Sequence, residues 1–318
     1  MSALIALPVL LPLLGAALSV GLGRRRALQR LVGVTTLTAV TAISAALLLR
    51  VDDQGTTAVQ AGGWDAPIGI TLVADRLAAI MLLIAMAMLL AVLVYAIGQP
   101  GAEGTHVGFH PVYLVLAAGV ALAFLTGDLF NLFVAFEVML MASYVLITLG
   151  GRRDQVRTGM TYVTISLLAS ALFLLALGLV YGATGTINLA DLGPKLAELP
   201  DGLRSGLAVL LVVVFGIKAA IFPLFFWLPD SYPTAPTPVT AIFAGLLTKD
   251  GVYALIRSQT LLFPADTQPG TLLLVVAGLT MTVGVLGAIT QNDIKRILSF
   301  HIVSQIGYMI MGLGLFTV

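Results

Sequence analysis

The chain of 318 residues carries only 31 charged side chains, 16 Lys and Arg with 15 Asp and Glu, and 59% of its residues are hydrophobic. Charged residues make up 10% of the chain, where a soluble domain usually carries about 25%, and this excludes a soluble globular enzyme. The net charge of +1 does not indicate a nucleic-acid partner, and the absence of cysteine excludes a disulfide framework, a thiolate metal site and a catalytic thiol.

Ten stretches of the sequence are apolar enough to cross a membrane, which takes about 20 residues of helix. The sequence therefore predicts an all-α polytopic membrane protein with ten transmembrane helices in one membrane domain. The first stretch is predicted to be a retained span and not a secretory signal, because its arginines follow it and none precedes it. The predicted spans are residues 3–22, 31–49, 77–97, 111–127, 129–149, 159–182, 206–228, 237–257, 271–289 and 297–316.

Two of the connecting loops are long enough to fold. Residues 50–76 alternate short apolar runs with Gly and Pro, which predicts a small hairpin, and residues 186–204 predict a short surface helix. Lys and Arg favour cytoplasmic loops, and an outside N-terminus places nine of them in inner loops and five in outer loops or helix ends. We therefore predict that the N-terminus and both folded loops lie on the outer face.

Three charged residues lie inside predicted spans, where a charge is rare unless it faces a polar interior. Glu137 lies near the middle of the fifth span, Lys218 near the middle of the seventh, and Lys249 past the middle of the eighth. Left in lipid, these three charges would cost roughly 8–10 kcal/mol. One interpretation is a Glu137–Lys218 ion pair that only fixes helix packing. The favoured one is a proton path, in which a buried lysine alternates between paired and unpaired states.

Five of the 14 prolines lie between residues 223 and 238. Pro223 cannot donate a backbone hydrogen bond to the carbonyl of Ala219, so we expect the seventh helix to break there. A broken membrane helix is tolerated where it is buried in protein or lines a wet cavity, and its carbonyl end favours a cation, here Lys218. The alternative is a plain proline kink, which is common in membrane helices.

The tenth span carries His301 among polar residues. Histidine titrates near neutrality, which suits a proton relay, although a lone histidine is as often a hydrogen-bonded packing residue. Asp250 follows Lys249 directly, and adjacent helical residues point about 100° apart, which does not favour direct pairing. Accessory positions of the path are Asp250, Lys295, Ser299 and Ser304, and residues expected to cap or solvate helix ends are Asp75, Arg76, Asp128 and Asp230.

The sequence has no motif for a nucleotide or a metal. No GxGxxG follows a strand, there is no P-loop, and the three histidines, His106, His110 and His301, are too scattered for a metal site. We therefore predict no cofactor, no metal and no nucleic-acid partner. The energy source is expected to be an ion gradient or another subunit.

One stretch of the chain carries a family resemblance. KAAIFPLFFWLPDSYPTAPTPVTAIFAGLLTKDGVYALIR, from Lys218 to Arg257, resembles the signature of the proton-translocating membrane subunits shared by NADH-quinone oxidoreductase (respiratory complex I) and the multisubunit Mrp cation/proton antiporters. FEVMLMASYVLI and ITQNDIKRILSFHIVSQIGYMI match as well, so the resemblance covers essentially the whole chain. Phe225 and the run from Ser299 to Met309 resemble the Mrp branch, and in particular its D-type subunits.

This resemblance implies roles for individual residues. Glu137 and Lys218 match the coupled pair of the family, Lys249 matches its central lysine, and His301 matches a link onwards through the membrane. The resemblance also implies two inverted five-helix repeats, of which the second is incomplete here, so the chain is expected to be C-terminally truncated. The implied parts are helices 1–3 with the outer-face hairpin in residues 1–110, a proton-translocating repeat of spans 4–8 in residues 111–257, and the start of the second repeat in residues 258–318.

Three functions remain open at this point. The leading hypothesis is a multi-pass plasma-membrane subunit of a monovalent cation (Na⁺ or K⁺)/proton antiporter, a secondary ion transporter and not an enzyme, that works with other subunits in the lipid bilayer. The second is an antiporter-like proton-pumping subunit of NADH-quinone oxidoreductase or a related redox complex. The third is a scaffold fragment that transports nothing.

Overall fold

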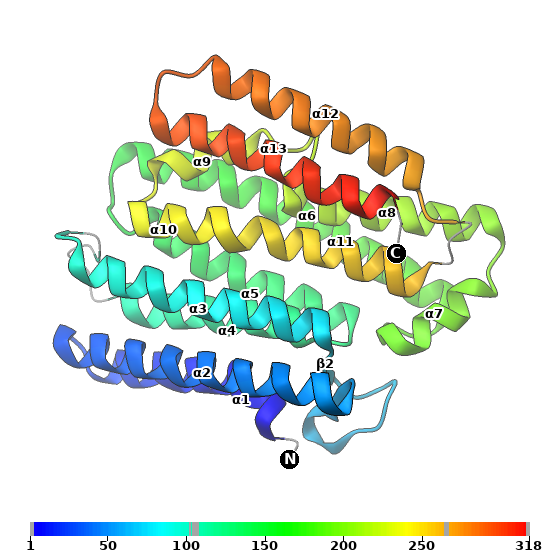
Figure 1. Cartoon of the computed structure of the whole chain (residues 1–318), viewed down its shortest axis with the longest axis horizontal. Helices are drawn as coiled ribbons and strands as arrows, with labels where there is room; N and C mark the ends of the chain where they lie inside the picture. Colours follow the sequence, from blue (N-terminus) through cyan, green and yellow to red (C-terminus); the bar gives the residue numbers. More distant parts are fainter. Residues whose placement is uncertain (1–2, 102, 104–107, 264–266, 316–318) are drawn as a thin grey trace. The chain divides into compact units, whose positions relative to one another are not determined.

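The computed structural model describes residues 3–101, 103, 108–263 and 267–315. Ten longer helices follow the predicted spans through these residues (Figure 1). They are α1 Ala3–Gly21, α2 Arg26–Gln54, α3 Arg76–Gly98, α4 Phe109–Leu125, α5 Leu129–Thr148, α6 Arg153–Thr184, α8 Asp201–Ala219, α11 Thr248–Leu262, α12 Gly270–Ile289 and α13 Ile294–Leu315. The shorter elements are β1 Thr57–Gln60, the 3₁₀ turn Ala61–Gly63, β2 Thr71–Ala74, α7 Leu189–Ala197, α9 Trp227–Ser231, the 3₁₀ turn Tyr232–Thr234, α10 Thr237–Ile242 and the π-helical turn Phe243–Leu247.

Within the described residues, nine helical segments are long and apolar enough to span a membrane, with α10, the π turn and α11 counted as one segment, Thr237–Leu262. The remaining predicted span is α4, a shorter apolar helix of 17 residues, 14 of which are buried. Because α4 packs against α1, α3 and α5, its apolar surface is covered by protein. The prediction of an all-α polytopic membrane protein is confirmed.

The contacts divide the chain into two compact units. The first comprises Met1–Val156 and Ala235–Ile242, and the second Arg157–Thr234 and Phe243–Val318. In the first unit α1, α2, α3, α4 and α5 lie side by side, and in the second α8 packs on α11 while α12 packs on α13. The sequence-based division of the chain at residues 110 and 257 was drawn from the implied repeats and not from compact units, and it stays a prediction.

The hairpin predicted for residues 50–76 is present in the first unit, and its location on the outer face stays a prediction. Strands β1 and β2 pair antiparallel, and the turn between α4 and α5 joins them because the Gly127 amide donates to the Thr71 carbonyl at 2.8 Å. Asp128 then begins α5 by accepting from the Asn131 amide, and Asp75 begins α3 by accepting from the Ala78 amide, each at 2.8 Å. These carboxylates satisfy amides that a helix start leaves free, so the capping prediction is confirmed for both.

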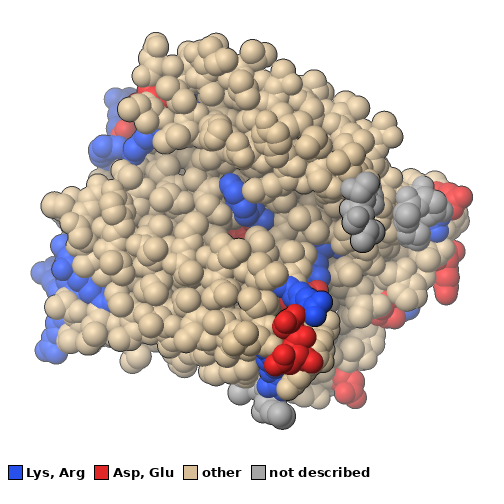
Figure 2. Space-filling view, in the orientation of Figure 1, with Lys and Arg blue, Asp and Glu red and all other residues tan. Residues whose placement is uncertain are grey.

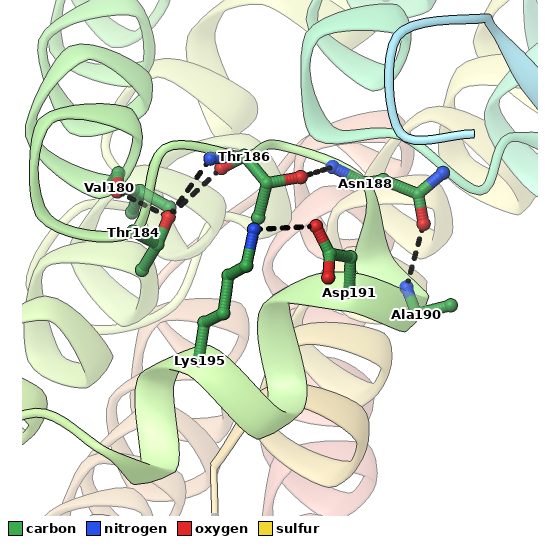
Figure 3. A network of polar contacts seen from close by, with 7 residues as sticks. All are labelled: Val180, Thr184, Thr186, Asn188, Ala190, Asp191 and Lys195. Atoms are coloured by element: carbon green, nitrogen blue, oxygen red, sulfur yellow. Dashed lines mark hydrogen bonds and ion pairs between the residues drawn. The ribbon is translucent and has the colours of Figure 1, made fainter. Parts of the chain in front are cut away.

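The predicted surface helix is α7, in the second unit (Figure 3). Asn188 begins it by accepting from the Ala190 amide at 3.1 Å, and Lys195 donates to Asp191 one turn earlier at 2.9 Å. The hydrogen bond from Lys195, with a second one from Thr186, holds the pKa of Asp191 below its usual value. The predicted range of 186–204 is too long, because Asp201 begins α8.

Charged side chains are sparse on the face shown in Figure 2, most of which consists of uncharged residues. Most of the helices carry apolar side chains on their exposed faces, with Leu18, Leu49, Ile84, Leu168 and Leu286 among those more than half exposed. Such surfaces are expected for helices that face lipid, because hydrocarbon solvates apolar groups and not charges.

Candidate functional site

The seventh predicted span is broken in the second unit, as the sequence predicted. Helix α8 ends at Ala219, and regular helix resumes only at Trp227 with α9, so the predicted span 206–228 is interrupted between these residues. The break begins before Pro223, at Ala220, which has the left-handed dihedrals φ 59° and ψ 48°. For a residue with a Cβ this conformation costs roughly 1–2 kcal/mol. The break is therefore set by a strained residue three positions ahead of the proline that predicted it.

Hydrogen bonds close the carbonyl end of α8. The Ala220 amide donates to the Ile217 carbonyl and the Ile221 amide donates to the Gly216 carbonyl, which is the Schellman pattern of helix ends. Ile217 also accepts from the indole Nε1 of Trp227 at 3.1 Å, so α9 is tied back to α8. The amide of Phe222 donates to the Oγ1 of Thr280 on α12 at 2.9 Å. The break is thus a defined structure and not a simple kink.

Lys218 lies one residue before the last residue of α8. Its Nζ donates to the Oγ of Ser170 on α6 at 3.5 Å, a long contact between two helices of the second unit. The carbonyls of Gly216 and Ile217 accept from N–H groups of the following segment, so they are not reserved for the lysine. The expected placement of Lys218 at the broken helix is confirmed.

Lys249 follows a π-helical turn that the sequence did not predict. Residues Phe243–Leu247 form this turn, and a π turn widens the helix by one residue and displaces the regular hydrogen bonds. Lys249 Nζ donates to the Ala244 carbonyl at 2.5 Å and to the Oγ1 of Thr248 at 3.4 Å. The ammonium is therefore directed back along its own helix to a carbonyl of the π turn. Such bulges frequently mark functional sites.

Gly251 brings this part of α11 against the broken end of α8. A Cβ at Gly251 would lie 2.5 Å from the Ala219 amide nitrogen and 2.8 Å from the Lys218 carbonyl carbon. No other residue type fits this distance without moving the backbone. The contact places the helical turn that holds Lys249 and Asp250 beside the last residues of α8.

Asp250 is buried between these segments, with 1% of its surface exposed. Among the described residues neither carboxyl oxygen has a hydrogen-bond partner, and Lys249 binds elsewhere, so the prediction that the two do not pair directly is confirmed. The carboxyl interacts electrostatically with the hydroxyl of Tyr232. Tyr232 belongs to a cluster of four aromatic rings, each in contact with two of the others, which the sequence did not predict. The aromatic cluster consists of Tyr162, Trp227, Tyr232 and Phe243.

Helix α13 carries the remaining sequence-predicted residues. Lys295 Nζ donates to the Pro233 carbonyl at 3.4 Å, so the start of α13 is linked to the segment after the break. Ser299 and Ser304 are buried, whereas His301 is exposed and its Nε2 lies 3.4 Å from the Nε2 of Gln305. The expected single polar band is therefore divided between a buried and an exposed face of α13.

Two further contacts fix the position of α13. Asp230 pairs with Arg296 at 3.0 Å, so it binds an arginine across the fold where the sequence predicted helix capping or solvation. Gly284 on α12 lies against α13, since a Cβ there would be 2.6 Å from the Ser304 amide nitrogen. Both contacts hold α13 to its neighbours in the second unit.

Glu137 lies in the first unit, half-buried on α5. Helices α4 and α5 approach closely beside it, because a Cβ at Gly119 would lie 2.8 Å from Met139 Cγ and 3.3 Å from Val138 Cγ1. Lys218 belongs to the second unit, and its pairing with Glu137 stays a prediction.

The first unit contains a second charged cluster, which was not predicted from the sequence. Arg30 binds Glu103 through two hydrogen bonds of 2.9 and 2.6 Å, and His110 Nε2 lies 3.1 Å from the same carboxylate. Arg30 and His110 are 73 and 7 positions from Glu103 in the chain, so no local pattern relates them. His106 lies outside the described residues. In the part of the chain that the structure describes, no group of three or more His, Cys, Asp or Glu side chains is placed to hold a metal.

Comparison with known proteins identifies the family. The family model "NADH:quinone oxidoreductase/Mrp antiporter, TM" matches residues 126–318, well over half of the chain. The D-type subunit of the Na(+)/H(+) antiporter of Alkalihalophilus pseudofirmus is 46% identical over 100% of this chain and 65% of its own length, and that of Bacillus subtilis is 38% identical with the same coverage. The chain thus spans about two thirds of the length of these curated relatives.

Two solved structures share the fold. The Mrp complex from Dietzia sp. DQ12-45-1b contains a chain that superposes with a TM-score of 0.94 at 35% identity, over 100% of this chain and 60% of that one. The membrane-bound sulfane sulfur reductase, an archaeal respiratory membrane complex, gives a TM-score of 0.90 at 27% identity, over 99% and 65%. The extent of the family match, together with the broken helix and its lysines, shows that this chain belongs to the NADH:quinone oxidoreductase/Mrp antiporter transmembrane family.

Proposed function

We propose that the chain is a membrane subunit of a multisubunit monovalent cation (Na⁺ or K⁺)/proton antiporter and that it conducts protons. The path runs through Glu137, Lys218, Lys249 and His301, and its accessory positions are Asp250, Lys295, Ser299 and Ser304. The observation that carries the proposal is the broken end of α8, where Lys218 lies beside the turn that holds Lys249. The resemblance to D-type subunits of Na(+)/H(+) antiporters and to a chain of an Mrp complex supports it.

Charges inside apolar helices are unfavourable unless they serve a purpose. Exposed to lipid, two lysines and one glutamate within apolar helices would cost roughly 8–10 kcal/mol. Apolar residues would pack these helices without that cost, so the charges indicate a function. Lys218 donates to the Ser170 hydroxyl, and Lys249 donates to the Ala244 carbonyl and the Thr248 hydroxyl. The carbonyl and the hydroxyl hold the ammonium group of Lys249 without neutralising its charge.

The test uses everted vesicles that contain the full-length protein with its partner subunits. Lys218→Ala and Glu137→Ala are each expected to abolish proton movement driven by added Na⁺ or K⁺, as reported by a pH-sensitive dye, while the complex still assembles. The matched controls are Lys195→Ala and Glu198→Ala on or beside α7, which carry the same charges at the surface. Unaltered proton movement in Lys218→Ala or in Glu137→Ala would rule out the path.

A redox-linked role is the second candidate. The fold likeness to a chain of an archaeal respiratory membrane complex favours it, as does a family that includes NADH:quinone oxidoreductase. Purification of the intact complex separates the two candidates, since an antiporter is recovered with other antiporter subunits and a redox pump with flavin and iron–sulfur proteins. A scaffold without transport predicts that neutralising Glu137, Lys218 and Lys249 together leaves ion movement unchanged.

The protein lies in the plasma membrane with its N-terminus outside, because that orientation places nine Lys and Arg residues in inner loops against five outside. Accessibility of a tag placed before residue 3 to an impermeant reagent on intact cells tests this orientation.

A further inference from the structure

Asp250 is a buried acid on α11. Its side chain is 1% exposed, and neither Oδ1 nor Oδ2 has a hydrogen-bond partner among the described residues. Withdrawing a carboxylate from water without a partner is strongly unfavourable, and buried acids are normally paired or hydrogen-bonded. An unpartnered carboxyl at this depth must therefore carry a proton or bind a cation.

The packing around Asp250 is close. Its neighbour Gly251 touches the backbone of α8, and the π turn precedes it on its own helix. The hydroxyl of Tyr232, fully buried within the aromatic cluster, interacts with it electrostatically. The aromatic rings exclude water on that side, so a charge on Asp250 is felt strongly by its neighbours.

Titratable and charged residues lie on α11 and on the elements that pack against it or against the π turn before it. Lys249, Tyr253 and Arg257 lie on α11 itself, and other groups belong to α8, α7 and α13, which pack on α11, and to α6 and the 3₁₀ turn after α9, which contact Phe243 of the π turn. They are Lys218 on α8, Asp191 and Lys195 on α7, Lys295, Arg296 and His301 on α13, Tyr162 on α6 and Tyr232 in the turn. Asp191 and Lys195 bind each other, and Arg296 binds Asp230, so these three are held elsewhere.

We propose that Asp250 is a proton-binding site that controls proton release from Lys249, an inference that rests on the proposed function and deepens it. A proton needs only one carboxyl oxygen, whereas a cation needs several ligands, and the described residues hold no group of three or more His, Cys, Asp or Glu side chains placed to bind a metal ion. When Asp250 is ionised, it favours the charged form of Lys249. When it is protonated, that support is lost.

The step balances in charge and atoms. A proton arriving along the path forms an O–H bond at a carboxylate oxygen of Asp250 and removes its negative charge. Lys249 then releases one proton from Nζ towards His301, the next residue of the proposed path, because its neighbouring charge is gone. The proton of Asp250 then passes to the neutral amine of Lys249, which restores the carboxylate and the ammonium together, so that one proton has entered and one has left.

The first measurement is infrared difference spectroscopy on vesicles that contain the full-length protein with its partner subunits. We expect a carboxylic-acid C=O band that shifts in D₂O and is missing in Asp250→Asn. The matched control, Asp191→Asn, changes a surface carboxyl that pairs with Lys195, and it should leave the band in place. A spectrum in which Asp250→Asn removes no acid band overturns the proposal, whether or not the protein transports ions.

The second measurement tests the nature of the bound species. A hydrophobic carbodiimide reacts with protonated carboxyls in apolar surroundings, and mass spectrometry of the peptide that contains Asp250 reports the reaction. We expect labelling that falls as the pH rises and that added Na⁺ or K⁺ does not reduce. Protection of Asp250 by either cation at constant pH overturns a proton site in favour of a cation site.

The third measurement separates function from packing. Asp250→Val removes a carboxyl that has no hydrogen bond to any residue the structure describes, so the thermal stability of the complex should stay the same or rise. The rate of cation-driven proton movement should nevertheless fall about tenfold. Removing an essential proton-transfer group would reduce it more, by roughly 10²–10⁴-fold. Loss of stability in Asp250→Val, or undiminished proton movement, contradicts the role. Loss of transport in Lys218→Ala together with normal transport in Asp250→Val would contradict the role of Asp250 and would still support the proposed function.

Discussion

The close approach between α8 and α11 can be tested by one methyl group. In Gly251→Ala the new Cβ would lie 2.5 Å from the Ala219 amide nitrogen, 2.8 Å from the Lys218 carbonyl carbon and 2.9 Å from the Ala219 Cα. All three atoms belong to the backbone, so no side chain can rotate away. Ordinary contact begins near 3.4 Å, and the two helices must therefore separate by about 0.9 Å at this point. Such overpacking costs about 1–3 kcal/mol.

The expected change in melting temperature follows from the size of the chain. Unfolding entropy of about 2.1 cal/mol/K per residue amounts to roughly 0.7 kcal/mol/K for 318 residues. A loss of about 1–3 kcal/mol therefore lowers Tm by about 1.5–4.5 °C. The sign is opposite to the usual effect of Gly→Ala inside a helix, which stabilises by up to about 1 kcal/mol.

The assay uses the purified chain in detergent and the fluorescence of Trp227. The chain has two tryptophans, and Trp64→Phe leaves Trp227, whose indole binds the Ile217 carbonyl at the end of α8, as the sole reporter. Gly206→Ala on α8 is the matched control, because a Cβ there meets nothing within 4 Å. Gly251→Ala should shift the emission of Trp227 and lower the melting temperature. Gly206→Ala should leave the emission unchanged and should not lower the melting temperature. A Gly251→Ala chain as stable as the control would refute the packing described for α8 and α11.

Two further predictions concern single contacts. Thr280→Val removes the acceptor of the part-buried Phe222 amide and should destabilise the chain by about 1 kcal/mol. Thr280→Ser keeps the hydroxyl and should destabilise it less, and equal melting temperatures for the two variants would contradict the hydrogen bond. Burial raises the pKa of Glu103, but the hydrogen bond and charge of Arg30 and the charge of His110 outweigh it and hold that pKa below its usual value. Its stabilising effect is therefore complete above the ordinary carboxyl range and is lost as the pH falls through the lowered pKa. Glu103→Gln should lower Tm at pH 7, and the difference from the unmodified chain should shrink as the medium is acidified below about pH 4.5; a constant difference would show that the charge of Glu103 is irrelevant.

Local sequence patterns determined much of the fold because they report local physics. Runs of about 20 apolar residues identify spans regardless of what they pack against, since lipid and protein interior both exclude polar groups. Asp75 and Asp128 cap the helices that follow them, as their positions indicate. The prolines after residue 222 predicted a break in the seventh span, because proline removes a donor wherever it stands.

The tertiary structure decided the details of the candidate site, which depend on residues far apart in the chain. The break begins at Ala220 because the end of α8 is closed by its own backbone, by Trp227 and, through Phe222, by Thr280. Arg30 and Glu103 are 73 positions apart, and only folding brings them together.

The low fraction of charged residues and the mid-span positions of Glu137, Lys218 and Lys249 can be read from the sequence alone, and they indicated a membrane protein with charges in its interior. Only the tertiary structure shows that Lys249 is directed to a carbonyl of a π turn and that Asp250 is buried without a hydrogen-bond partner among the described residues. The physical reason is that a side chain's charge is a local property, whereas its desolvation and its partners are set by every segment that packs around it.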